Sequence, residues 1–172
     1  MKLLDMLIPE ERIEEIKPEN RESVIKLIKE VSIFNQAEIK IAIELIDLSI
    51  KGNKDYITKV YKSKEEDIWG FICYGKNLLG EGVWELYWIA VNPSFQRKGI
   101  AKRLMEHFES EVAKDNGRLI LIETSSSSIY RSARKLYESM SYSKTCWIKD
   151  FYKPGDDKII YKKIITKKNK LF

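Results

Sequence analysis

The sequence is poor in the residue types that bind metals or cross-link chains. It contains one histidine, His107, and two cysteines, Cys73 and Cys146, which lie far apart and lack the spacing of a zinc site. We therefore expect reduced thiols, no metal ion and a cytoplasmic protein. Long apolar runs are also missing. The apolar start of the chain is short and contains Asp5, so it predicts neither a signal peptide nor a membrane span.

No internal repeat or low-complexity segment divides the chain. Its 172 residues, 44% hydrophobic and 33% charged, suit one globular domain. We expect a single domain over residues 1–172, with a core at about 12–166 and a basic tail at 167–172. The net charge of +5 suits an anionic ligand but is too small to argue for nucleic acid binding.

Periodicity and turn signals predict an alternation of strands and helices. The expected strands lie at about 12–17, 55–61, 67–74, 84–91, 118–123, 143–152 and 158–165. The expected helices lie at about 18–31, 35–51, from the junction near residue 99 to about 116, and 128–140. The strand at 118–123 is nearly all apolar, as in strands buried on both faces. Pro154-Gly155 predicts a type II turn. The order indicates an α/β protein with a mixed sheet and helices on both faces.

One stretch, residues 84–108, has the features of a phosphate-binding junction. An apolar run ends at the turn dipeptide Asn92-Pro93, and a helical pattern begins after Gly99. The start of a helix offers unpaired N–H donors and the positive end of the helix dipole. Arg97 and Lys98 add positive charge, and Gly99 lets the backbone approach a ligand. The alternative is a glycine that only starts a helix.

The pattern Gln-x-x-Gly-x-Ala at 96–101, after a strand ending Val-x-Pro, resembles the pyrophosphate loop of the GNAT superfamily of acyl-CoA-dependent N-acyltransferases. The element order from 12 to 166 also resembles that family. The resemblance implies an α/β fold with a mixed, mostly antiparallel central sheet. It further implies acetyl-CoA as cosubstrate and an amine acceptor, which could be a polyamine, an amino acid, an antibiotic or a protein amine. A homodimer is left open.

The resemblance also implies which residues bind the cofactor. Backbone amides of the loop would hold the pyrophosphate: Gln96, Arg97, Lys98, Gly99, Ile100 and Ala101. In the family the preceding strand splays from its neighbour and receives the pantetheine arm. The corresponding residues are Ile89, Ala90 and Val91, with the Ile89 N–H polarising the acetyl carbonyl. Alternatively, these three residues form a buried strand without a ligand.

Glu85 is the expected general base, because the base of lysine-acetylating family members also lies eleven residues before the loop glutamine. Its neighbours Trp84 and Leu86 are apolar, and we expect desolvation to favour proton uptake near neutral pH. The alternative is an acid at a solvent-facing position. Glu81 and Glu123 are weaker candidates.

Tyr137 is the expected general acid, since the segment Ala133-x-x-x-Tyr137 resembles the family segment whose tyrosine reaches the thioester sulfur. A phenol and a thiol have comparable pKa values, roughly 10 and 8.5, which makes proton donation to a thiolate reasonable. The alternative is a core tyrosine on an apolar helix stripe. Tyr130 replaces the asparagine of many relatives and leaves the adenine contacts open.

Several other side chains could have either a functional or a structural role. His107 could be catalytic or could lie on a helix flank. Arg131, Arg134 and Lys135 could meet the coenzyme 3′-phosphate or form a solvated helix face. Asp150, Asp156 and Asp157 could receive a cationic amine or serve turn formation. The lysines from 162 to 170 could contact nucleic acid or an acidic partner, although a solvated edge and tail is favoured.

The sequence therefore predicts an acetyl-CoA-dependent N-acetyltransferase with direct transfer. No covalent intermediate on the enzyme is expected, because neither cysteine has a paired base. Two alternatives are a non-catalytic CoA-binding or partner-binding module of the same fold and a basic nucleic-acid binder.

Overall fold

The computed structural model describes residues 12–166. The expected basic tail at 167–172 lies outside this range. The strands are β1 (Arg12–Glu15), β2 (Ile57–Lys62), β3 (Ile68–Lys76), β4 (Val83–Val91), β5 (Leu119–Ser125), β6 (Ser143–Lys153) and β7 (Asp156–Ile164). The helices are α1 (Arg21–Val31), α2 (Gln36–Ile50), α3 (Ile100–Lys114) and α4 (Arg131–Ser139). All the predicted strands and helices are thus confirmed, with shifts of a few residues at their ends.

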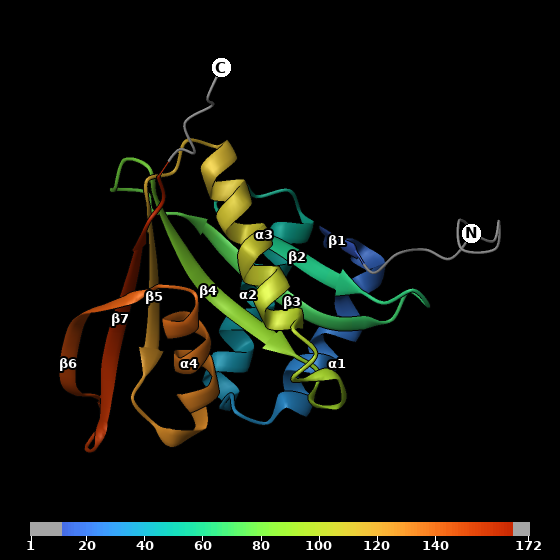
Figure 1. Ribbon diagram of the computed structural model, residues 1–172. Coiled ribbons are helices and arrows are strands. Elements are labelled where there is room, and N and C mark those ends of the chain that lie inside the picture. Colours follow the sequence, from blue (N-terminus) through green and yellow to red (C-terminus); the bar gives the residue numbers. More distant parts are fainter. Residues whose placement is uncertain (1–11, 167–172) are drawn as a thin grey trace, which may run out of the picture. The chain divides into compact units, whose positions relative to one another are not determined.

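The strands form one sheet in the order β1-β2-β3-β4-β5-β7-β6. β4 and β5 are parallel, whereas β1 with β2, β5 with β7, and β6 with β7 are antiparallel. Figure 1 shows β6 and β7 as a hairpin beside β5. The expectation of an α/β fold with a mixed, mostly antiparallel sheet is confirmed. Within residues 12–166, no helix has both the length and the apolar character needed to cross a membrane.

The described residues form two compact units that alternate along the chain. Unit 1 comprises residues 12–73 and 88–104, and unit 2 comprises 74–87 and 105–166. β3, β4 and α3 each contribute residues to both units. The expectation of one domain over the whole chain stays a prediction.

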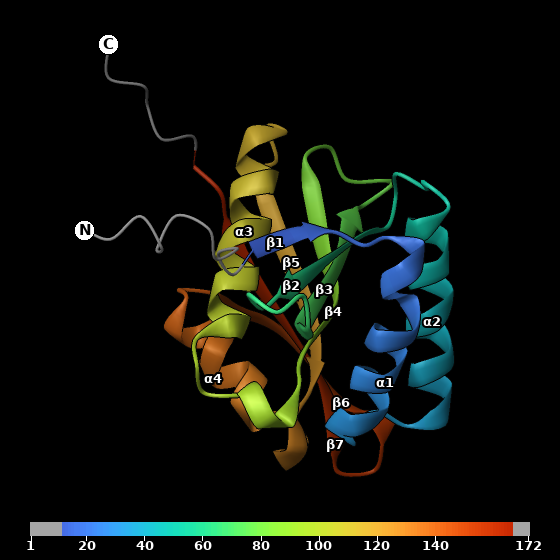
Figure 2. The ribbon, with the colours of Figure 1, turned by 90° about the vertical axis from the view of Figure 1, so that its right-hand side faces the viewer.

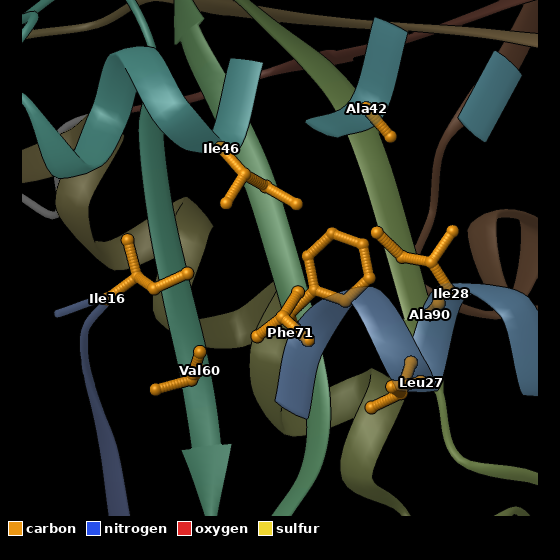
Figure 3. Close-up of a cluster of buried hydrophobic side chains, with 9 residues drawn as sticks. Ile16, Leu27, Ile28, Ala42, Ile46, Val60, Phe71 and Ala90 are labelled. Carbon is orange, nitrogen blue, oxygen red and sulfur yellow. The ribbon is translucent and has the colours of Figure 1, made fainter. Parts of the chain in front are cut away.

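In unit 1, helices cover both faces of the strands. α1 and α2 run side by side (Figure 2) over an apolar cluster around Phe71 (Figure 3). The preceding position, Gly70, points the other way, because a Cβ built there would lie 3.1 Å from Ile100 and 3.2 Å from Leu104 of α3. The expectation of helices on both faces is therefore confirmed within this unit.

Polar contacts fix the two N-terminal helices. α2 begins with a capping box, in which the Glu38 N–H donates to Asn35 Oδ1 and the Asn35 N–H donates to Glu38 Oε2, at 3.0 and 2.7 Å. Arg21 of α1 binds both carboxylate oxygens of Asp47 of α2, at 2.6 and 2.9 Å. The two helices therefore keep a fixed register over the apolar cluster.

In unit 2, α4 and residues 105–114 of α3 contact the same face of the strands. The Tyr137 ring of α4 lies 5.7 Å from the Tyr161 ring of β7, and Lys163 of β7 pairs with Glu109 of α3 at 2.7 Å. Ile120 and Ile122 of β5 point toward this face and are buried.

The opposite face of β5 differs from the prediction. Leu119 and Leu121 are only partly buried, and Glu123 is exposed. The expectation that this strand is buried on both faces is therefore wrong. Its apolar character alone does not determine the cover, which depends on where α3 and α4 pack in this unit.

Candidate active site

The junction between β4 and α3 presents several backbone donors to one side. Arg97 and Gly99 have left-handed φ values of 61° and 80°, a conformation that turns successive N–H groups toward a common point. The first hydrogen bond of α3 runs from Arg103 N to Gly99 O at 3.0 Å. The amides of Ile100 and Ala101 precede this bond and have no intrahelical acceptor. A Cβ added to Gly99 would meet open space, so this side of the junction is accessible.

Two stacked aromatic rings, Phe95 of the junction and Trp69 of β3, hold the junction against the sheet. The Phe95 ring lies 4.2 Å from the Trp69 ring at an angle of 10°. The Lys98 ammonium lies 5.1 Å from the Phe95 ring and 5.5 Å from the Trp69 ring, within the range of a cation–π contact. The stack fixes the loop to β3 and keeps a positive charge beside the free amides.

Hydrogen bonds hold the two ends of the loop. The Asn92 N–H donates to the Trp69 carbonyl at 2.9 Å, and its side-chain amide donates to Glu30 of α1 at 2.8 Å. The Gln96 side-chain amide donates to the Val91 carbonyl at 3.2 Å. Gln96 therefore contributes through its side chain to loop geometry, beside any role of its backbone.

The expected pantetheine-binding residues continue β4 in unit 1. Ala90 and Val91 are buried, and Ile89 is partly buried. In unit 2, the ladder between β4 and β5 runs from Val83 opposite Leu119 to Leu86 opposite Ile122 and does not include Tyr87.

Glu85 lies on the first half of β4 and is partly buried. Its Oε1 accepts a hydrogen bond from Asn77 Nδ2 at 2.9 Å, and its Oε2 accepts one from Tyr87 Oη at 3.2 Å. The expected apolar surroundings of this carboxylate are therefore not found. The apolar neighbours Trp84 and Leu86 point to the other face of the strand, because side chains alternate.

Tyr137 is buried in unit 2, with 5% of its surface exposed. Burial raises the pKa of this phenol above its ordinary value, with a smaller contribution from Tyr161. The phenol is therefore protonated throughout the neutral range, but it is a weaker acid than the comparison with a free thiol implied.

Glu85 and Tyr137 lie on opposite faces of the sheet in unit 2. Glu85 is opposite Leu121 on β5, while the next β5 residue, Ile122, points to the other face and is opposite Tyr161 on β7. The Tyr137 ring packs against that same Tyr161. The two expected catalytic residues are therefore separated by the plane of the sheet.

The aspartates of the β6–β7 hairpin serve turn formation. Asp157 accepts from the Trp147 indole and from the Asp150 N–H, and Asp150 accepts from the Gly155 N–H at 2.7 Å. Asp156 accepts from the Ser125 hydroxyl. Gly155 has a φ of 80°, as the third position of a type II turn requires, so the predicted turn is confirmed. These contacts favour the turn interpretation over an amine site.

Other candidates are also engaged in structural contacts. Arg134 Nη1 donates to the Ser125 and Ser127 carbonyls at 2.6 and 2.8 Å, which ties α4 to the end of β5. Glu123 pairs with Lys158. Cys73 is buried, and burial raises the pKa of its thiol to about 12, so it is not an activated nucleophile.

Two features of the site were not foreseen. Asn77 contacts Glu85, and the stack of Phe95 on Trp69 supports the loop. The pattern Asn-x-x-Gly that begins at residue 77 is a turn signal and predicts a loop there. It does not predict that Asn77 contacts Glu85 on β4.

The loop residues fit the diphosphate of a coenzyme A molecule. Free amides at a helix start, an accessible Gly99 and the nearby charges of Arg97 and Lys98 are the donor set that a phosphate group requires.

Comparisons with known proteins show the family to which the chain belongs. The acetyltransferase (GNAT) domain model matches residues 54–144, just over half of the chain. A protein from Desulfovibrio desulfuricans, assigned to the GNAT family of acetyltransferases, has 30% sequence identity and a TM-score of 0.86 over 91% of this chain and 99% of its own. The chain therefore belongs to the GNAT acetyltransferase family.

More distant structures share the fold. The ribosomal-protein-S18-alanine N-acetyltransferase of Escherichia coli is 19% identical, with a TM-score of 0.75 over 94% of this chain and 98% of its own. An aminoglycoside 6′-N-acetyltransferase in complex with coenzyme A is 18% identical, with a TM-score of 0.72 over 90% and 97%. A search of curated proteins gave no match.

Proposed function

We propose that this protein transfers the acetyl group of acetyl-CoA directly to an amine. The observation that carries this proposal is the junction at 96–101, where left-handed Arg97 and Gly99 precede the free amides of α3. Acetyl-CoA would supply an acetyl group activated as a thioester. The loop amides would hold its diphosphate, and binding energy there would position the reacting end.

The backbone of Ile89, Ala90 and Val91 would hold the pantetheine arm. Backbone N–H and C=O groups of an extended segment such as this one can serve as donors and acceptors for an extended ligand. The Ile89 N–H would donate to the acetyl oxygen and stabilise the negative charge that develops on it.

Glu85 and Tyr137 would act from opposite faces of the sheet. As the amine nitrogen bonds to the acetyl carbon, Glu85 would take the proton that the nitrogen loses, directly or through water. As the carbon–sulfur bond breaks, its electron pair stays on sulfur, and Tyr137 would donate a hydrogen bond to that sulfur. The separation of the two residues suits an amine that enters on one face and a thiol that leaves on the other.

The raised pKa of Tyr137 refines its role. A buried phenol transfers its proton completely only to a strong base. A thiolate in the same desolvated surroundings is also a stronger base than in water, so the two effects act in the same direction. Tyr137 therefore acts first as a hydrogen-bond donor and gives up its proton late.

The test is an acceptor screen that detects the free thiol released from acetyl-CoA. The panel holds polyamines, amino acids, an aminoglycoside, and peptides with free N-terminal or lysine amines. We expect thiol release with at least one class, and a fall in kcat of about 100-fold or more in Glu85→Gln. Glu81→Gln is the matched control, since the Glu81 contact with Arg118 uses its backbone carbonyl. A protein that binds coenzyme A but releases no thiol with any amine would contradict the proposal.

A further inference from the structure

Asn77 directly follows β3 and begins the loop that leads into β4. Its N–H donates to the Val83 carbonyl at 2.9 Å, which closes the hairpin between the two strands. Its Oδ1 accepts from the amides of Leu79 and Gly80 at 3.0 and 2.8 Å. The loop therefore binds Asn77 through both its backbone and its side-chain oxygen.

These contacts fix the orientation of the Asn77 amide. With Oδ1 facing two N–H donors, Nδ2 must face the other way, where Glu85 Oε1 lies 2.9 Å from it. The reversed amide would place an NH₂ against two N–H groups and an oxygen against a carboxylate, so all three contacts would become repulsive. The side-chain NH₂ of Asn77 therefore acts as a donor toward Glu85.

The Glu85 carboxylate is held on both of its oxygens. Tyr87 Oη, two residues along the same face of β4, donates to Oε2 at 3.2 Å. Each carboxylate oxygen offers two lone-pair directions, so both can accept one structural hydrogen bond and still receive a further proton.

The charged groups on this face of unit 2 come from the neighbouring strands. The strand register places three charged residues on the same face as Glu85: Glu123 of β5, and Lys158 and Lys162 of β7. Glu123 forms an ion pair with Lys158. Lys76, which precedes Asn77, lies over the Trp84 ring and pairs with Asp115, on the other face of β4. The donors that touch Glu85 directly are therefore the neutral side chains of Asn77 and Tyr87.

We propose that Asn77 is a positioning residue for the general base, holding the Glu85 carboxylate in one orientation. This inference rests on the proposed function, because it assigns Asn77 a role only through Glu85. It extends the site to the β3–β4 loop, which the family pattern at 96–101 does not include.

The test is the pH dependence of kcat/KM in Asn77→Asp. The new Oδ atoms still accept from Leu79 and Gly80, so the loop keeps its turn, but the group facing Glu85 becomes a second carboxylate. A like charge in contact favours the protonated form of the pair. We expect the acid limb of the profile to move to higher pH by about one unit, with the KM for acetyl-CoA unchanged.

Asn53→Asp is the matched control, since the Asn53 Oδ1 also accepts a loop amide, that of Asp55 at 2.7 Å. Its profile should equal that of the wild type. Tyr87→Phe removes the other donor to Glu85 and should also move the acid limb to higher pH, by a smaller amount. This variant provides a second test if Asn77→Asp does not fold.

The possible results separate the two hypotheses. Suppose that Glu85→Gln is slow but the acid limb stays in place in folded Asn77→Asp and in Tyr87→Phe. This result would overturn the positioning role of Asn77 and leave Glu85 as the base. A Glu85→Gln protein with the turnover and pH profile of the wild type would instead overturn Glu85 as the base, and the inference with it. A shifted limb in Asn77→Asp with an unshifted one in Asn53→Asp supports the proposal.

Discussion

The surroundings of single side chains in this protein depend on the partners that orient them. Glu85 is held by one donor on each carboxylate oxygen, and Tyr137 is buried among aromatic rings. Neither environment follows from the residue type. A glutamate beside tryptophan suggested apolar surroundings, but the strand turns those neighbours to the other face. The chemistry expected of each residue therefore depends on which face of the sheet it occupies.

Replacement of Tyr137 by phenylalanine tests the proton donor. We expect kcat to fall by roughly 10-fold to 100-fold, the cost of one hydrogen bond to a charged atom, while affinity for coenzyme A is kept. Below about pH 10 the wild-type rate should not fall through ionisation of this phenol, because burial raises its pKa.

Tyr142→Phe is the matched control for this measurement. Tyr142 is also buried, and its ring lies 6.2 Å from that of Tyr137. Steady-state kinetics should show a large loss only in Tyr137→Phe. Equal turnover in the two variants would assign Tyr137 to the core rather than to the reaction.

The loop between β4 and α3 is the element whose conformation is most visible in the sequence. Its turn dipeptide, its glycine and the helical pattern that follows are local signals, so the sequence sufficed to predict it. Its support is not local. Trp69 lies on another strand, about 26 residues before Phe95, and only the folded chain brings the two rings into contact.

Loss of the aromatic stack should weaken cofactor binding. Such a stack is worth about 0.5–1.5 kcal/mol, so we expect Phe95→Leu to lower the affinity for coenzyme A by roughly 2-fold to 10-fold. The rate at saturating acetyl-CoA should change little. Phe151→Leu, which alters an exposed ring in contact with Lys158, is the control. Unchanged affinity in Phe95→Leu, measured by calorimetry, would count against the support role.

The edge strand β1 is held to β2 by ion pairs. Lys62 is 8% exposed and contacts Glu14 at 2.6 Å and Glu66 at 3.3 Å. The pKa of Glu14 lies below its ordinary value, mainly because Lys62 donates to it. A lowered pKa in the folded state means that this stabilisation is present above the unfolded pKa of Glu14 and is lost as pH falls through the folded pKa.

Glu14→Gln should therefore destabilise the protein in a pH-dependent way. We expect a loss of about 1–2 kcal/mol in the free energy of unfolding at pH 7, because Lys62 keeps only one acidic partner. Urea denaturation at pH 7 and pH 3 checks this, and the difference from the wild type should shrink at pH 3. A difference that is equal at both values would show that the charge of Glu14 contributes nothing.

The whole chain illustrates what periodicity can and cannot predict. The type and order of the elements follow from apolar spacing, caps and turn residues, such as Asn35 before α2 and Gly155 between β6 and β7. Which face of a strand is covered by other elements does not follow from these signals. β5 is apolar on both faces, yet Leu121 is only partly buried because the unit 2 helices pack on the face of Ile122. The contact of Asn77 with Glu85 likewise requires the closed hairpin.

Calorimetric titration of coenzyme A into wild type, Gly99→Val and Gly52→Val tests the central claim most directly. Gly99 and Gly52 share φ values of 80° and 81°, and a Cβ would meet open space at both, so the same backbone strain is introduced twice. We predict one binding site in the wild type and in Gly52→Val, and affinity weaker by roughly 10-fold or more in Gly99→Val. Absence of binding to the wild type, or equal affinity in the two folded variants, would contradict the account.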